Sequence, residues 1–514
     1  MKTYIKLLKR SCALVGPIFF FLTTTIAQKQ DYVWLSGYNS AYVEDTGLNA
    51  KFGVNKIDFN TEPAIITRDS LGMGFRFTNV SYSNANGNLL FYSNGIYIAN
   101  SLDERIENSD SMNAGFWQYE WDLSAQDIGY ITYNGILALE DPSSPGSFYL
   151  IHSFIDTVDA NLNFGCTRIY STYLDMNANA GRGKVLAKDQ TILSGRFGYE
   201  LKATRHANGR DWWLLVQKRS TNCYERILID DKGIHTLGTT CGGQSVNGAS
   251  GSACFSQDGS KYVYVGMYGG INLFDFDRCT GELSNPQYFP LTIFQDLGAI
   301  GIGSAFSPKG RFLYVNATIH CYQFDLWAAD VWTSIDTVAV YDGFAAPFGS
   351  AFHTMQIAPD GKIYSSCGNT EWVYHVIDSP DRKGDSCLFK QHGVELPSYS
   401  GGVPNFVNYR LGALAGSPCD TIASRPGSGQ EKDIRVYPNP ATDFVTVDYG
   451  FTNWSKGEIF LEITNGLGQI VYRQKPPMYS GLQKIEVSRL AAGVYQITLQ
   501  RNGLVTAKEQ FSKL

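Results

Sequence analysis

In the middle of the chain, short apolar runs recur, each directly after a polar turn that contains glycine. The glycines of four such turns, Gly209, Gly259, Gly310 and Gly361, are 50, 51 and 51 residues apart. The apolar runs that follow them are Trp212–Val216, Tyr262–Val265, Phe312–Val315 and Ile363–Tyr364. Glycine between two short apolar runs is typical of a tight β-hairpin. A period near 50 built from hairpins predicts a β-propeller repeat.

The same pattern extends upstream with wider spacing. Gly87 precedes the run Leu89–Tyr92, and Gly146 precedes Phe148–Ile151. These two units bring the repeats to six. A seventh blade would be closed by a strand near residues 32–35 that pairs with residues 406–409, since a closed ring leaves no free sheet edge. We therefore predict seven blades over residues 28–411, with six and eight as alternatives.

The amino-acid composition of the chain changes after residue 411. Residues 412–433 are rich in Gly, Ser and Pro, which is typical of a linker. Residues 434–514 contain short segments of alternating apolar and polar residues, which predict a small Ig-like β-sandwich. The predicted fold class is all-β, a propeller followed by a sandwich.

The first 27 residues have the pattern of a signal peptide. Lys2, Lys6, Lys9 and Arg10 precede the apolar run Ala13–Leu22, and small residues stand before Gln28. We predict cleavage between Ala27 and Gln28. The apolar run is shorter than the roughly 20 residues that span a bilayer. We therefore expect export and no transmembrane segment in the mature chain.

Composition narrows the classes of partner and cofactor. The formal net charge is −6, and no basic stripe occurs along the chain, so we expect no nucleic acid partner. There is no Cys-x-x-Cys, and we expect no metal and no other cofactor. Nine cysteines follow the predicted cleavage point, an odd number, so at least one stays free or pairs outside this chain. In an oxidising compartment we predict the disulfides Cys223–Cys241 and Cys367–Cys387.

Four motifs near the C-terminus occur in a fixed order: Val436–Thr442, Asn465–Gln469, Leu490–Tyr495 and Lys508. Together they resemble the type A C-terminal sorting domain of the type IX secretion system of Bacteroidetes. The resemblance implies passage through the periplasm to the outer-membrane surface or the medium, with the secretion machinery as partner. The residues that carry the resemblance are Tyr437, Pro438, Asn439, Pro440, Gly468, Gly493, Tyr495 and Lys508.

The body also resembles secreted YVTN- and WD-type propeller proteins, for example in Gly87–Gly95 and Met355–Tyr364. This second resemblance implies the fold and says almost nothing about activity.

Catalytic signatures are absent from the sequence, which has no G-x-S-x-G and no H-E-x-x-H. The first hypothesis is therefore a non-catalytic module that binds a glycan or a protein. The alternative is a propeller enzyme, a lactonase or a polysaccharide-cleaving enzyme, with its site at the channel mouth. The candidate ligand-binding residues are Trp117 and Trp121, in a long polar insertion, and His353, just before a repeat strand. For all three, a packing role is the alternative interpretation.

Overall fold

The computed structural model describes most of the chain after the predicted signal peptide. The described residues are 28–43, 46–115, 129–158, 164–245, 250–267, 269–290, 301–419, 434–449, 459–466, 468–476, 481–501 and 504–514. The chain divides into two compact units, residues 1–422 and 423–514. Within the described residues, no helix has the length and apolar character needed to cross a membrane.

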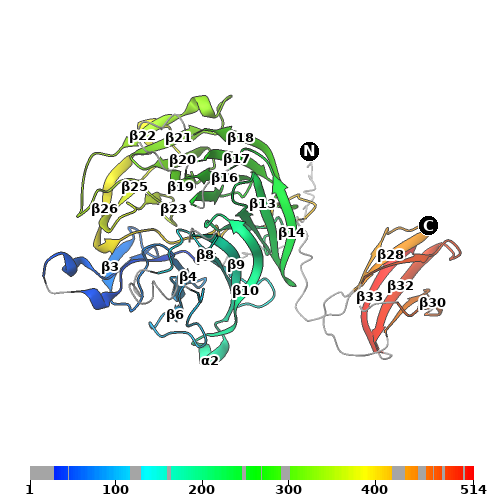
Figure 1. Ribbon diagram of the computed structural model, residues 1–514. Helices are drawn as coiled ribbons and strands as arrows, with labels where there is room; N and C mark the ends of the chain where they lie inside the picture. The colour runs from blue at the N-terminus through cyan, green and yellow to red at the C-terminus, as the bar shows by residue number, and fades with distance from the viewer. Residues whose placement is uncertain are drawn as a thin grey trace, which may run out of the picture. The chain divides into compact units, whose positions relative to one another are not determined.

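Seven antiparallel sheets make up the described part of the first unit, and each is formed by consecutive strands. Figure 1 shows them arranged around a common centre. The first two sheets are β1 (Val33–Gly37), β2 (Val54–Asp58) and β3 (Ile65–Asp69), then β4 (Val80–Ser83), β5 (Leu89–Ser93) and β6 (Ile98–Asn100). The third and fourth are β7 (Ile136–Glu140), β8 (Ser147–Thr157), β9 (Phe164–Asp175) and β10 (Lys184–Phe197), then β11 (Lys202–Arg205), β12 (Trp212–Gln217), β13 (Cys223–Asp230) and β14 (Gly233–Cys241).

The remaining three sheets have four strands each. They are β15 (Gly251–Phe255), β16 (Lys261–Gly266), β17 (Gly270–Phe276) and β18 (Leu283–Phe289), then β19 (Gly301–Phe306), β20 (Phe312–Ala317), β21 (His320–Asp325) and β22 (Asp336–Val340), then β23 (Met355–Ile357), β24 (Ile363–Ser365), β25 (Glu371–Ile377) and β26 (Phe389–Ser400). The all-β class and the propeller of seven blades are thus confirmed.

Two of the second strands, β12 and β20, are buried along their whole length. Every residue of β12 and of β20 is buried, because the neighbouring blades cover both faces of the sheet. Their sequences, WWLLVQ and FLYVNA, accordingly read as continuous rather than alternating apolar runs. This burial between blades is what holds the ring together.

The repeat glycines connect the first and second strands of six blades. Gly87, Gly146, Gly209, Gly259, Gly310 and Gly361 all have φ between +70° and +86°, which glycine adopts without strain. The first blade has a different connection: residues 38–53 join β1 to β2 and contain the short helices η1 (Ser40–Tyr42) and η2 (Leu48–Lys51). For this reason the repeat pattern shows six units where the structure has seven blades.

The predicted closure of the ring is wrong in its pairing. β1 pairs with β2 of its own sheet, and residues 406–409 do not form a strand. Instead, the first and last sheets pack against each other through Asn55. Its Nδ2 donates to the carbonyls of Ser398 (3.0 Å) and Tyr399 (3.2 Å), and its Oδ1 accepts from the Ser398 amide (2.8 Å).

The chain then crosses the centre of the ring as residues 401–411, which we name the central segment. Asn405 Nδ2 donates to the carbonyls of Asn134 (2.9 Å), Ile136 (2.9 Å) and Leu201 (3.2 Å), and the Tyr409 hydroxyl donates to the carbonyl of Ala138 (2.9 Å). Because these partners belong to different blades, no single strand pairs with the segment. It fills the centre rather than completing a sheet.

Within the described residues there are two disulfides, and one of them was predicted. Cys223 and Cys241 are bonded, as expected for residues directly opposite each other in β13 and β14. The second disulfide joins Cys279, between β17 and β18, to Cys419. Together with the Leu414 amide, which donates to the carbonyl of Ala207 (2.8 Å), it holds residues 412–419 on the body.

The predicted disulfide Cys367–Cys387 is wrong, since both are free thiols in the part of the chain described. Cys367 follows β24, and its Sγ lies 3.3 Å from the carbonyl of Val373 in the middle of β25. Cys387 ends the short helix η5 (Gly384–Cys387), and its carbonyl accepts from the Ser379 amide (2.9 Å), beyond the C-terminal end of β25. The extended backbone from Val373 to Ser379 separates the two cysteines by about 20 Å. A disulfide needs Cα atoms within about 7 Å.

The second unit is a β-sandwich of two sheets around its own buried core, which contains Val447, Leu461 and Ile497. One sheet has the order β27-β28-β31 and the other β30-β29-β32-β33. The strands are β27 (Ile434–Tyr437), β28 (Phe444–Tyr449), β29 (Ile459–Thr464), β30 (Ile470–Gln474), β31 (Gly481–Glu486), β32 (Gly493–Arg501) and β33 (Leu504–Lys513).

Candidate functional site

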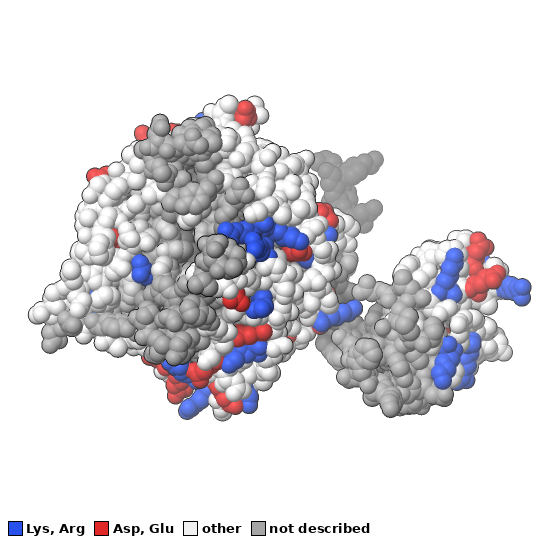
Figure 2. All heavy atoms as spheres, in the orientation of Figure 1, with Lys and Arg blue, Asp and Glu red and all other residues white. Residues whose placement is uncertain are grey.

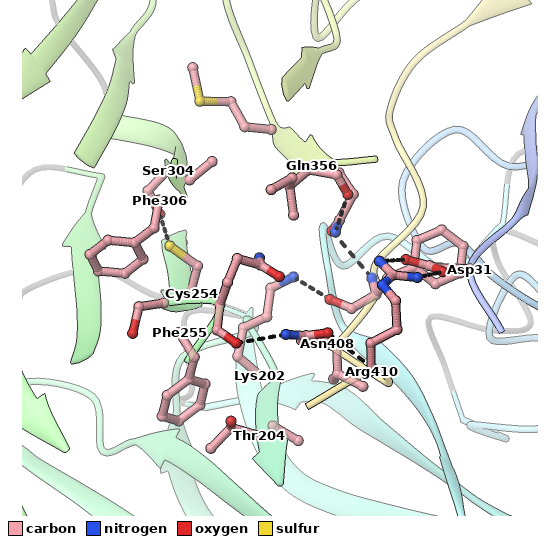
Figure 3. Close-up of a pocket in the computed structure, with 18 residues that line it drawn as sticks. Asp31, Lys202, Thr204, Cys254, Phe255, Ser304, Phe306, Gln356, Asn408 and Arg410 are labelled. Carbon is pink, nitrogen blue, oxygen red and sulfur yellow. Dashed lines mark hydrogen bonds and ion pairs between the residues drawn. The ribbon is translucent and has the colours of Figure 1, made fainter. Parts of the chain in front are cut away.

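A small cavity lies at the centre of the propeller, between the first strands of four blades and the central segment (Figure 3). Its volume is about 50 Å³. One water needs about 10–15 Å³ on this measure, so the cavity has room for a few waters. The polar residues around it include Lys202 and Thr204 from β11, Cys254 from β15, Ser304 from β19 and Gln356 from β23.

Strand geometry explains how these side chains reach the cavity. Successive side chains of a strand point to opposite sides, so Lys202 and Thr204 share one side of β11. The β15 and β19 side chains meet in the same way: Ser304 Oγ lies 2.9 Å from Ser252 Oγ and 3.5 Å from Cys254 Sγ. The cavity is therefore lined by small polar groups and Lys202, together with the apolar residues Phe255 and Phe306 and the Asp31–Arg410 pair.

Lys202 has few partners for a buried cation. Its Nζ donates to the carbonyl of Phe406 at 3.3 Å, and no carboxylate of the described residues lies within 4 Å of it. Thr204, on the same strand, keeps its Oγ1 buried without a hydrogen-bond partner in the described chain. The cavity thus contains hydrogen-bond donors that the described residues do not satisfy.

The central segment is fixed to the walls of the cavity by its own polar contacts. Asn408 Nδ2 donates to the carbonyl of Gln257 at 2.7 Å, and the Phe406 amide donates to Gln356 Oε1 at 3.3 Å. Arg410 binds Asp31 through both of its terminal nitrogens, with Nη2 2.8 Å from Oδ2. Because Asp31 is engaged in this pair, it does not neutralise Lys202.

Burial sets the protonation of the ionisable groups here. It lowers the pKa of Lys202 to about 8 and raises the pKa of the Cys254 thiol to about 11. At neutral pH the lysine is therefore mostly charged. The thiol stays protonated and is a poor nucleophile.

His353 lies just before β23, as predicted, but outside the residues that line the cavity. Its ring centroid is 4.6 Å from that of Tyr133, and its Nδ1 is buried without a partner among the described residues. Burial lowers the pKa of His353 to about 4, so the ring is neutral at physiological pH. The geometry is that of a packed histidine.

Three other residues singled out in the sequence are not described by the structure. Trp117 and Trp121 fall outside the described residues, as does Ala27. Gln28 is described, and its carbonyl accepts from Arg410 Nη1 at 3.5 Å. No linear motif identified Lys202 or the central segment, because their importance comes from the closure of the ring.

In the sandwich, most of the predicted sorting residues lie at strand ends and turns, whereas Tyr495 and Lys508 lie within strands. Tyr437, Pro438, Asn439 and Pro440 are exposed at the end of β27, where Asn439 Oδ1 accepts from the Ser512 amide (2.9 Å). Gly468 is in the β29–β30 turn with φ +78°, and Gly493 begins β32. The Tyr495 hydroxyl donates to the carbonyl of Ala491 (2.8 Å), and Lys508 is exposed on β33.

The surface of the body carries both signs of charge. On the face shown in Figure 2, Asp and Glu lie close to Lys and Arg, and most of the described surface is uncharged. Ion pairs such as Lys184–Glu107 (2.7 Å) and Arg105–Asp110 (2.7 Å) are part of this pattern. Within the described residues, no group of three or more His, Cys, Asp and Glu is arranged to hold a metal ion.

Comparison with known proteins identifies the second unit. Residues 435–512 match the family model of the secretion system C-terminal sorting domain. This match marks a type IX secretion signal, which directs the protein to the cell surface or the medium. No curated protein matches the chain.

Solved structures similar to the chain are β-propeller proteins. A protein assigned as a 6-phosphogluconolactonase from Bacteroides uniformis is 13% identical, with a TM-score of 0.45, over 73% of this chain and 99% of its own. The periplasmic gluconolactonase PpgL of Pseudomonas aeruginosa is 10% identical, with a TM-score of 0.32, over 71% and 96%. PorZ, a surface component of the type IX secretion system of Porphyromonas gingivalis, is 10% identical, with a TM-score of 0.28, over 90% and 68%. Likenesses this distant say nothing about activity.

Proposed function

We propose that this exported protein is a non-catalytic binding module, whose propeller body presents a glycan- or protein-binding surface at the cell surface or in the medium. The type IX sorting domain directs the protein to the cell surface or the medium. The propeller supplies a rigid scaffold, on which the connections between blades carry recognition.

The observation that carries the proposal is the filled centre of the ring. An enzyme with its site in the channel needs a pocket for its substrate, whereas the cavity that the described residues form around the central segment has a volume of about 50 Å³. A sugar lactone with its hydroxyl groups needs several times the space of the few waters that fit there. This favours recognition at the outer surface over catalysis in this cavity.

Exposed aromatic rings on the connection between β22 and β23 supply a surface of the kind that binding requires. Phe344 is 38% exposed and Phe348 is 57% exposed. Phe344 stacks on His392 at a centroid distance of 4.3 Å, and His392 Nε2 lies 3.0 Å from Asp342 Oδ2. Aromatic rings beside polar groups suit contact with sugar rings or with peptide side chains.

Thermal unfolding tests this function. The protein from Gln28 onward is melted with a panel of polysaccharides, lactones and Ca²⁺, and with peptide pools. A ligand at about 100 times its dissociation constant stabilises the native state by about 2.7 kcal/mol. We expect a saturable rise in Tm with one glycan or peptide that is recovered chemically unchanged. Consumption of a lactone or a glycan would instead establish the enzyme.

Two variants locate the surface. Phe348→Ala should remove most of the ligand-induced rise in Tm, because it deletes an exposed ring of the β22–β23 connection. The matched control is Trp327→Ala, which removes another exposed ring, on the β21–β22 connection. Equal responses of the two variants would place the binding surface elsewhere on the propeller.

A further inference from the structure

We propose that the central cavity is a binding site for one small monovalent anion, held by the buried ammonium group of Lys202 where the central segment meets β11. This site is separate from the surface proposed above for a glycan or a protein, and neither inference depends on the other.

The first argument is charge balance. Lys202 is 8% exposed, and its ammonium group has three donors, of which the Phe406 carbonyl accepts one. The other ionic groups that line the cavity are Asp31 and Arg410, which neutralise each other. The described part of the cavity therefore has one uncompensated positive charge. A buried charge without a counterion is costly, and a bound anion removes that cost.

The second argument is the supply of donors. Thr204 Oγ1 is buried in the cavity wall without a partner in the described residues, on the same strand as Lys202 (Figure 3). The obvious acceptors are already used: the Phe406 carbonyl by Lys202, and Gln356 Oε1 by the Phe406 amide. The remaining ammonium protons of Lys202 and the Thr204 hydroxyl can donate to a ligand that accepts hydrogen bonds.

The third argument is size. The cavity of about 50 Å³ corresponds to a few waters. Chloride, bromide, nitrate or formate fits this space with a water beside it, whereas a phosphoester or a sugar acid does not. Deprotonation of Lys202 does not solve the charge problem at neutral pH, since its pKa is about 8. The ligand class is therefore a small anion of single charge.

Such an anion would join two parts of the ring. Lys202 already contacts the central segment through Phe406, and the anion adds a second link between β11 and the interior. Its binding energy would appear as stability of the closed ring.

The test is thermal unfolding of the protein from Gln28 onward at pH 6.5, with chloride exchanged for gluconate at constant ionic strength and constant cation. We expect Tm to rise with chloride along a saturating curve. In Lys202→Met the rise should disappear, because the cation is replaced by a neutral side chain of similar length. The matched control is Lys232→Met, which removes an exposed lysine and should keep the full chloride response. A chloride response that is absent from the wild type, or equal in Lys202→Met, overturns the proposal.

A second measurement decides the matter if Lys202→Met does not fold. Crystals of the wild-type protein grown in bromide should show an anomalous scattering peak in the cavity, at hydrogen-bonding distance from Lys202 Nζ. A cavity that contains water and no bromide overturns the proposal in the same way.

Discussion

Glu200 and Lys202 show how burial acts in opposite directions on two neighbouring residues of the ring centre. Glu200 Oε1 accepts from the Gly251 amide at 2.6 Å, and its Oε2 accepts from the Tyr264 hydroxyl at 3.3 Å. Even so, desolvation raises the pKa of Glu200 to about 7, while it lowers the pKa of Lys202 to about 8. Burial therefore favours the protonated carboxyl of Glu200 and the deprotonated amine of Lys202, which are the neutral forms of these groups.

The raised pKa of Glu200 predicts a specific dependence of stability on pH. Between pH 4.5 and 7 the native state holds a proton that the unfolded state has released. The free energy of unfolding should therefore fall by up to about 3 kcal/mol as pH rises through this window. Urea denaturation of Glu200→Gln should lack this fall, and the variant should be the more stable protein at pH 8. Glu62→Gln, at an exposed position, should follow the wild type; the same fall in Glu200→Gln would contradict the assignment.

Sequence reasoning did not find the site, although one signal existed. Counting seven residues back from each repeat glycine gives Lys202, Ser252, Gly303 and Thr354. Lys202 is thus a charged residue at a position where the other three repeats have small ones. The pattern does not say whether the position faces the centre, because that depends on how the ring closes. His353, selected for its place before a strand, has its ring against that of Tyr133 and is not among the residues that line the cavity.

At the scale of elements, the sequence predicts those structures that depend on residues close together in the chain. The hairpin glycines predicted the turns of six blades, because a turn that needs a positive φ at one position favours glycine at that position. The central segment had no such signal: its backbone and side chains bond to several blades that are distant in sequence. The same reason explains the missed disulfide Cys279–Cys419, whose partners are 140 residues apart.

The central segment should contribute strongly to stability through Asn405. Its buried amide nitrogen donates to three backbone carbonyls. Asn405→Ala leaves these carbonyls without that donor, so we expect a loss of about 2–4 kcal/mol in the free energy of unfolding. Chemical denaturation measures it. Asn86→Ala, in an exposed turn, is the control and should change stability by less than about 0.5 kcal/mol. Similar effects of both variants would show that the segment is not a structural support.

At the scale of the whole molecule, the propeller and the sandwich with the sorting signal are separate units. The propeller and the sandwich each have a hydrophobic core of their own, and each is a compact unit. All the sorting motifs lie in the sandwich, which is a unit with its own core. Removal of one unit should leave the other folded.

Deletion of residues 434–514 should therefore separate export from folding. We expect the truncated chain to melt as the body does in the full protein, and to remain in the periplasm of its host, because the type IX signal is lost. Cell fractionation and a melting curve check both statements. The full chain, expressed at the same level, is the control. Truncated protein at the cell surface or in the medium would mean that the body has a sorting signal of its own.

The contact between Asn55 and Ser398 has a consequence for the order in which the propeller folds. These residues are 343 positions apart, and the central segment follows them in the chain. Because a polypeptide is synthesised from its N-terminus, the first blade exists long before its neighbour in the ring. Its flank stays uncovered until the last blade and residues 401–411 have arrived, and contacts this distant form slowly. The ring is thus completed at the end of folding, and the interval before completion is when the protein most needs protection from aggregation.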